Sequence, residues 1–440
     1  MKDFLRYNMV TMNDWLRFHP YEKPSQVDDY YQKLCNRLLK ANIDEPLCKD
    51  MNQLEYKELT CMLVCWFEDV ISETNIWRSF TAEHKRMYGR FLPFYNTEDD
   101  YYEDEINLQD IQFLIWHFFS MVENDIFISP YYPIFNSFAQ KAYALFEAEY
   151  ETAPPNLLYK DHFKIPENRD FFKTRRAMDF LTYQSYLNYL YAQQELSKKL
   201  DVLSKREYND DDYALLSYDI IEGTVNDSVS PLLALRANEQ LANILGKEHP
   251  KYDLIKNISK RYSLTCQIKS INDNCWELEH IATGKHINFA KEILSENART
   301  KQIQAGHSIF VSLAQWGDEW VLTGTMITYP TTKAAESRGK NEKHIFDPFE
   351  PEIETDKINK TLYKALMEGN EAGKVTDIQK LIIGNSASAQ FVKYLIDNEL
   401  IEFDQNKEMD DKTIKDNLDF LLRYYKTDDY FYEPKVAVEN

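Results

Sequence analysis

Glycine is scarce in the first half of this 440-residue chain, where only Gly89 precedes Gly223. Phosphate-binding loops and the tight strand-to-helix turns of dinucleotide-binding domains need residues without a Cβ atom. A P-loop or a Rossmann domain is therefore excluded from the first half of the chain.

Basic side chains are also in deficit. The 51 lysines and arginines stand against 72 acidic residues, which gives a formal net charge of −21. This balance repels phosphate backbones and anionic lipid surfaces. The densest acidic run, residues 98–105, lacks the glycine that a calcium-binding loop places among its ligands, so a solvated loop is predicted there.

Cysteines and long apolar runs are few. Six cysteines in a chain of this length do not make a disulfide framework, and no charged and apolar leader opens the sequence. The longest apolar run, residues 113–122, is about half of a membrane span. The sequence therefore predicts a cytoplasmic protein without a membrane segment, and it indicates no cofactor.

Apolar residues at spacings of three and four dominate the first part of the chain. Leu59, Met62, Leu63 and Trp66 form one face of a helix, and residues 108–122 repeat the pattern. Residues 1–257 are therefore predicted to be a large helical domain. Within it, residues 167–206 are predicted to be one long helical stretch.

The pattern changes to a period of two near Tyr262, where Leu264, Cys266 and Ile268 alternate with polar residues. Five short strands within residues 258–330 are best satisfied by closure into a small β-barrel of the OB or SH3-like kind. Residues 331–356 then read as a charged linker, and residues 357–440 as a small helical C-terminal domain. The predicted fold class is α+β.

Two segments resemble known families. NDWLRFHPYEKPSQVDDYYQKLCNRL, residues 13–38, resembles the opening of an uncharacterised family of Bacteroidetes proteins. Residues 280–326, from HIATGKHINF through GHSIFVSLAQWGDEWVLTGTM, are similar to a small β-module of bacterial proteins of unknown function. Some relatives of that module carry a cysteine-rich zinc-binding tail, which is absent here. The resemblances imply a bacterial origin and supply no catalytic motif.

The hairpin at residues 312–326 carries the candidate interaction residues Trp316, Asp318 and Trp320. The two indole rings could present an aromatic platform to a base or to a proline of a partner. Alternatively, the rings seal one end of the barrel core. Residues 262–329 contain five basic and seven acidic side chains, and this balance disfavours nucleic acid as the ligand.

Other candidate sites are weaker. Cys266, Cys275, His280 and His286 lack the short spacings that place two zinc ligands on one turn, so no metal site is predicted. Cys61 and Cys65 lie among apolar residues and are interpreted as core thiols. His117, between two aromatic residues, is interpreted as a packing histidine.

No nucleophile motif such as G-x-S-x-G occurs, so no catalytic residue is assigned. The leading hypothesis is a non-catalytic protein-interaction or scaffold role, with a protein as partner. The alternative is nucleic-acid binding by the barrel or by a helix-turn-helix-like C-terminal segment, whose groove face offers Lys393 beside Asp397 and Glu399. The second alternative is an enzyme whose site in the helical domain gathers scattered His, Asp and Glu side chains.

Overall fold

A computed structural model describes the fold. The described residues are 9–329 and 431–432, without residues 43, 46–50, 89, 93–94, 123–126, 129, 167–170, 206–209, 229, 231, 234, 273–274 and 291–302. The predicted linker at 331–356 lies outside the described residues, and so does the predicted C-terminal helical domain apart from residues 431–432.

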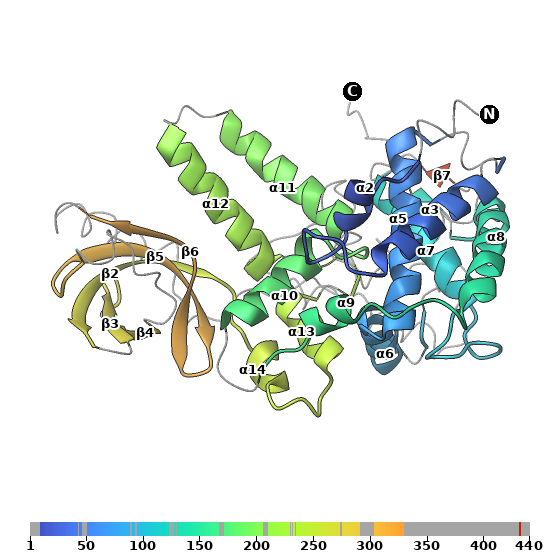
Figure 1. Cartoon of the computed structure of the whole chain (residues 1–440). Coiled ribbons are helices and arrows are strands. Elements are labelled where there is room, and N and C mark those ends of the chain that lie inside the picture. The colour runs from blue at the N-terminus through green and yellow to red at the C-terminus, as the bar shows by residue number, and fades with distance from the viewer. Residues whose placement is uncertain are drawn as a thin grey trace, which may run out of the picture.

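Helices make up the first part of the described chain, and a closed five-stranded barrel follows, so the predicted α+β class is confirmed. The barrel lies at one end of the molecule beside α12, and α3, α5, α7 and α8 lie at the other end (Figure 1). The twelve helices of the described residues are α2 (Met12–Leu16), α3 (Asp28–Ala41), α5 (Gln53–Ser72), α6 (Ile76–Tyr88), α7 (Leu108–Val122), α8 (Pro133–Glu149), α9 (Leu157–His162), α10 (Phe171–Tyr183), α11 (Tyr189–Ser204), α12 (Asp210–Asp227), α13 (Ala237–Leu245) and α14 (Tyr252–Lys256).

Helix α5 is the central helix of the helical domain. It begins at a capping box, in which the Asn52 side chain accepts from the backbone N–H of Glu55 and the Glu55 carboxylate accepts from that of Asn52. Its residues from Glu58 to Asp69 are all buried, because α2, α3, α6, α7 and α9 contact it on different sides. A helix that is buried all round must find partners for every polar side chain that it carries.

The barrel strands are β2 (Tyr262–Ile271), β3 (Cys275–His280), β4 (His286–Ala290), β5 (Ser308–Trp316) and β6 (Glu319–Thr328), and they close in the order β2-β3-β4-β6-β5. Four pairings are antiparallel, and the pairing of β4 with β6 is parallel. Of the two barrel kinds predicted, this strand order is that of the OB fold. The alternating residues Leu264, Cys266 and Ile268 are all buried in the barrel core, as predicted.

The barrel is joined to the helical domain through one closely packed face. The Arg261 guanidinium pairs with the Asp219 carboxylate of α12 at 2.8 Å. The backbone N–H of Arg261 donates to the Asp227 carboxylate at 2.6 Å. A Cβ atom at Gly223 would lie 2.6 Å from this guanidinium, and one at Gly324 would lie 3.1 Å from the Asp219 carboxylate. Both glycines therefore let α12 and β6 approach each other.

Two further features differ from the sequence expectation or extend it. The helical stretch predicted at 167–206 consists of two helices, because the chain turns between α10 and α11. Gln184 and Ser185 both donate their backbone N–H groups to the carbonyl of Phe180, which ends α10. A short antiparallel pair joins β1 (Phe127–Ile128) to β7 (Phe431–Tyr432), so a segment near the end of the chain returns to the helical domain.

Candidate functional site

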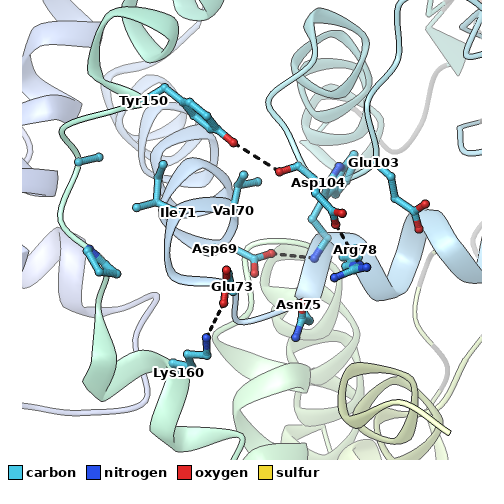
Figure 2. Close-up of a pocket in the computed structure, with 13 residues that line it drawn as sticks. Asp69, Val70, Ile71, Glu73, Asn75, Arg78, Glu103, Asp104, Tyr150 and Lys160 are labelled. Carbon is cyan, nitrogen blue, oxygen red and sulfur yellow. Dashed lines mark hydrogen bonds and ion pairs between the residues drawn. The ribbon is translucent and has the colours of Figure 1, made fainter. Parts of the chain in front are cut away.

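A polar cleft of about 600 Å³ opens in the helical domain, at the C-terminal end of α5 (Figure 2). This volume is within the usual range for small-molecule sites. The lining side chains come from the end of α5, the start of α6, the loop before α7, the end of α8, the segment that leads into α9, and α9 itself. They are Asp69, Val70, Ile71, Glu73, Asn75, Trp77, Arg78, Glu103, Asp104, Tyr150, Ala153, Pro155 and Lys160.

Asp69 fixes the floor of the cleft. Its carboxylate accepts from the backbone N–H groups of Ile76 (3.2 Å) and Trp77 (2.7 Å), from the Tyr186 hydroxyl (2.7 Å) and from the Thr74 hydroxyl. The carboxylate thus caps the N-terminus of α6, where a negative charge is favoured. Burial raises the pKa of Asp69, and these hydrogen bonds oppose that rise. Four donors on one carboxylate make the turn between α5 and α6 rigid.

The turn itself holds two residues in the left-handed backbone region, Glu73 at φ 52° and Asn75 at φ 67°. Glu73 ends α5, and the backbone N–H of Thr74 donates to the Asp69 carbonyl to close the helix end. Glycine is the usual residue at this position because a side chain costs about 1–2 kcal/mol there. The chain instead places a carboxylate at this point, on the wall of the cleft (Figure 2).

Two ion pairs lie at the cleft. Arg78 Nε is 3.2 Å from Asp104 Oδ1, and Lys160 Nζ is 2.7 Å from Glu73 Oε2 (Figure 2). The side chains of the first pair are 55% and 66% exposed, and those of the second are 38% and 74% exposed. Exposed pairs of this kind contribute only about 0–1 kcal/mol. Breaking either pair therefore costs little, and all four charged groups are able to form other contacts.

Replacing Glu73 with glycine is expected to raise the free energy of unfolding by up to about 1 kcal/mol, because glycine adopts the left-handed conformation without strain. Urea denaturation measures the change. Glu73→Ala is the matched control, since alanine also removes the Lys160 pair but keeps the backbone strain, and it should not stabilise the protein. If the two variants are equally stable, the claim that a side chain at position 73 strains the backbone is contradicted.

A buried polar cluster lies behind the cleft floor. One of its members, Glu68, directly precedes Asp69 in α5. His19, Asp28 and Glu68 are fully buried, and one ligand-type atom of each lies within 4.8 Å of the others. His19 Nε2 is 2.7 Å from Glu68 Oε2, and His19 Nδ1 is 3.1 Å from the Trp15 carbonyl oxygen. Burial opposes protonation of His19, but the charge of Glu68 and the hydrogen bond to it outweigh burial and raise the pKa of His19.

Neutral donors satisfy the two carboxylates of the cluster. Asp28 Oδ1 accepts from Trp15 Nε1 at 2.8 Å and from the Tyr21 hydroxyl at 3.1 Å, and Asp28 Oδ2 accepts from a backbone N–H. Glu68 Oε1 accepts from Asn156 Nδ2 at 2.8 Å. Asn156 follows Pro155, which lines the cleft, so a single segment of chain borders both sites.

The hairpin residues predicted from the sequence do not lie at the cleft. Trp316 is 2% exposed and its ring packs edge-on against Phe171 of α10, with centroids 5.6 Å apart. Trp320 is 7% exposed and packs against Tyr262 inside the barrel. Asp318, in the turn between them, is exposed. A partner at this hairpin would therefore meet Asp318 and not the two indole rings.

Most of the other candidate residues lie in the protein cores. Cys61 and Cys65 are buried in α5, as predicted. His117 is buried, and its Nε2 donates to the Leu187 carbonyl at 2.8 Å, which agrees with a hydrogen-bonded packing histidine. Among the barrel residues considered for zinc, Cys266 and His280 are cross-strand neighbours in the buried interior, whereas the His286 side chain is 71% exposed.

Sequence reasoning missed the cleft and the cluster, although one signal was present. Glu68 and Asp69 are adjacent acids in the otherwise apolar run CWFEDVI of α5. Two acids inside a helix that is buried all round require dedicated partners. His19 lies about 50 positions before Glu68, and Tyr186 lies about 120 positions after Asp69. No sequence spacing indicates partners at such distances.

The fold and the cleft define an α+β protein in which a helical domain with a polar cleft is joined to a small β-barrel. The family described as "Protein of unknown function (DUF3843)" matches residues 10–301, and the chain belongs to this family. The matched segment contains every residue that lines the cleft. No curated protein and no solved structure matches the chain. Among the described helices, none combines the length and apolar character needed to cross a membrane.

Proposed function

We propose that the protein is a binding protein whose helical domain takes up a small polar ligand carrying charges of both signs. The observation that carries this proposal is the cleft at the end of α5, where Arg78 and Lys160 lie with Glu73, Glu103 and Asp104 on a rigid frame. An anionic group of the ligand would pair with the two cations. An ammonium group would pair with the carboxylates.

The lining favours binding over nucleophilic chemistry. The described residues that line the cleft include no serine, threonine, cysteine or histidine, so the site lacks the nucleophile and the imidazole base of Ser-His and Cys-His hydrolases. We therefore propose a non-catalytic role for the cleft, which lies in the helical domain, where the second alternative from the sequence expected an enzyme site.

Binding is tested with three probes of different charge: L-glutamine as a zwitterion, succinate as a dianion and putrescine as a dication. Isothermal titration calorimetry should show that L-glutamine binds best, because it engages both charge types in the cleft. Arg78→Ala and Lys160→Ala should each weaken its binding by about tenfold, the value of one charge-assisted hydrogen bond.

Lys205→Ala is the matched control, because Lys205 forms an exposed pair with Asp201 on α11, away from the cleft. It should bind L-glutamine as the wild type does. If none of the three probes binds, or if binding is unaffected by both cleft variants, the proposal fails.

A protein partner is the second candidate function, as expected from the sequence. The exposed side chains of Leu157 and Leu158, 67% and 47% exposed at the start of α9, support it, because adjacent exposed leucines are typical of contact surfaces. At the barrel, Asp318 stays the proposed contact residue. The bacterial origin, the cytoplasmic location and the β-module resemblance also stay predictions.

This candidate is tested by pull-down with Leu157→Ser/Leu158→Ser and with Asp318→Lys, which change exposed side chains and leave the cores intact. A protein that is captured by the wild type and lost with either variant supports an interaction role. Capture that is unchanged in both variants excludes these two surfaces.

A further inference from the structure

The hydrogen-bond partners of the His19 ring show which of its two nitrogen atoms carry a hydrogen. His19 Nδ1 faces a carbonyl oxygen, which only accepts hydrogen bonds, so this nitrogen carries a hydrogen atom. His19 Nε2 faces a Glu68 carboxylate oxygen at 2.7 Å, and an ionised carboxylate also only accepts. At this separation the two atoms share a proton, carried by the ring or by the carboxyl group. Alternatively, they move apart by a few tenths of an ångström and ligate a metal ion.

The charge balance favours the metal ion. With a proton, one positive charge would face the carboxylates of Asp28 and Glu68 in a fully buried site. Among the described residues, no lysine or arginine donates to either carboxylate, so the site would keep one uncompensated negative charge. Burial of an unpaired charge is costly. A divalent cation with a neutral imidazole and two carboxylates has no net charge.

The surrounding hydrogen bonds have the pattern that holds metal ligands in place. A ligating histidine commonly donates its other N–H to a backbone carbonyl, and ligating carboxylates are commonly hydrogen-bonded in turn. Here the Trp15 carbonyl fixes the His19 ring, Trp15 and Tyr21 hold Asp28, and Asn156 holds Glu68.

Distances and one unpaired hydroxyl agree with an ion. Ligands that are each about 2.0–2.2 Å from a metal lie roughly 3–3.5 Å apart. The three ligand atoms lie within 4.8 Å of one another, with His19 Nε2 and Glu68 Oε2 2.7 Å apart, so small movements would bring them to this spacing. The Tyr159 hydroxyl is fully buried without a hydrogen-bond partner among the described residues. Its ring lies 5.2 Å from that of His19, and the charges of Asp69 and Glu68 act on its hydroxyl.

We propose that His19 Nε2, Asp28 and Glu68 bind one divalent transition-metal ion, with zinc or manganese as the best match to one imidazole and two carboxylates. This metal site is separate from the proposed ligand site in the cleft, because Arg78 and Lys160 do not belong to the metal site.

Metal binding is tested on the full-length protein. Elemental analysis of protein purified without chelator should give about one metal ion per chain. After stripping with a chelator, addition of ZnCl₂ or MnCl₂ should raise the midpoint of thermal unfolding, because an ion that binds only the folded state stabilises it.

Glu68→Gln is the decisive variant. The glutamine amide can donate to the His19 Nε2 lone pair and still accept from Asn156, so the hydrogen bonds persist in neutral form while the anionic ligand is lost. Metal affinity should fall at least about 100-fold, since loss of a supporting residue alone costs about 10–100-fold. Glu58→Gln, at another buried glutamate of α5, should bind metal as the wild type does.

Two outcomes would overturn the proposal. One is wild-type protein that holds no metal and whose unfolding midpoint does not respond to either salt. The other is a Glu68→Gln variant that binds metal as tightly as the wild type. Either result would identify the cluster as a proton-bridged structural pair, and neither would affect the proposal for the cleft ligand.

Discussion

Replacement of Trp316 with alanine is expected to lower the free energy of unfolding by about 3–5 kcal/mol, the usual cost of truncating a fully buried large side chain. The indole is 2% exposed and belongs to the core of the helical domain, although it is carried by a barrel strand. Its ring packs edge-on against Phe171 of α10. The loss should therefore fall on the junction between the barrel and the helical domain.

Chemical denaturation measures the total loss, and hydrogen exchange locates it. Trp316→Ala should increase exchange at the start of α10 and along β5. Trp320→Ala is the informative comparison, because its ring lies inside the barrel, and it should increase exchange in β2 and β4. Gln315→Ala changes an exposed neighbour and should cost less than about 0.5 kcal/mol. A loss below about 1 kcal/mol for Trp316→Ala would contradict the packing.

The different positions of the two tryptophans follow from strand register. Gln315 pairs with Trp320, and Trp316 pairs with Glu319. Successive pairs of an antiparallel ladder point to opposite faces of the sheet. Trp320 therefore enters the barrel, while Trp316 points outward and meets α10. The turn at Gly317–Asp318 is visible in the sequence, but the helix that would cover the outer face of the hairpin is not.

Elements with strong periodicity were predictable, and contacts between distant segments were not. Alternation at Leu264, Cys266 and Ile268 was enough to predict a strand, because a two-residue period has one structural cause. Five such short strands within one segment then predicted the barrel. The cleft depends instead on how α5, α6 and α9 pack, which brings Lys160 to Glu73 across 87 positions. The same holds for His19 and Glu68, 49 positions apart. Such pairs are set by tertiary packing, which leaves no local pattern.

His117 is expected to make the protein lose stability as the pH falls below about 6.5. Burial lowers the pKa of His117 to about 4, and the hydrogen bond to the Leu187 carbonyl only partly opposes this shift. The unfolded chain has an ordinary histidine pKa of about 6.5. Between these values the unfolded state binds more protons than the folded state, so acid favours unfolding. Burial also lowers the pKa of His84 to about 3, in the same direction.

The size of the His117 effect follows from the same two pKa values, since between pH 7.5 and pH 5 this residue should cost about 2 kcal/mol of stability. His117→Gln keeps a donor for the Leu187 carbonyl but does not titrate, so its unfolding free energy should fall by about 2 kcal/mol less than that of the wild type over this interval. Urea denaturation at the two pH values measures the difference.

Ile115→Val, a buried truncation on the same helix, controls for general destabilisation. It should keep the wild-type pH dependence, at a cost of about 1 kcal/mol at both pH values. A His117→Gln variant that loses as much stability on acidification as the wild type would show that this imidazole is protonated in the folded protein, and that a negative charge near α7 compensates it.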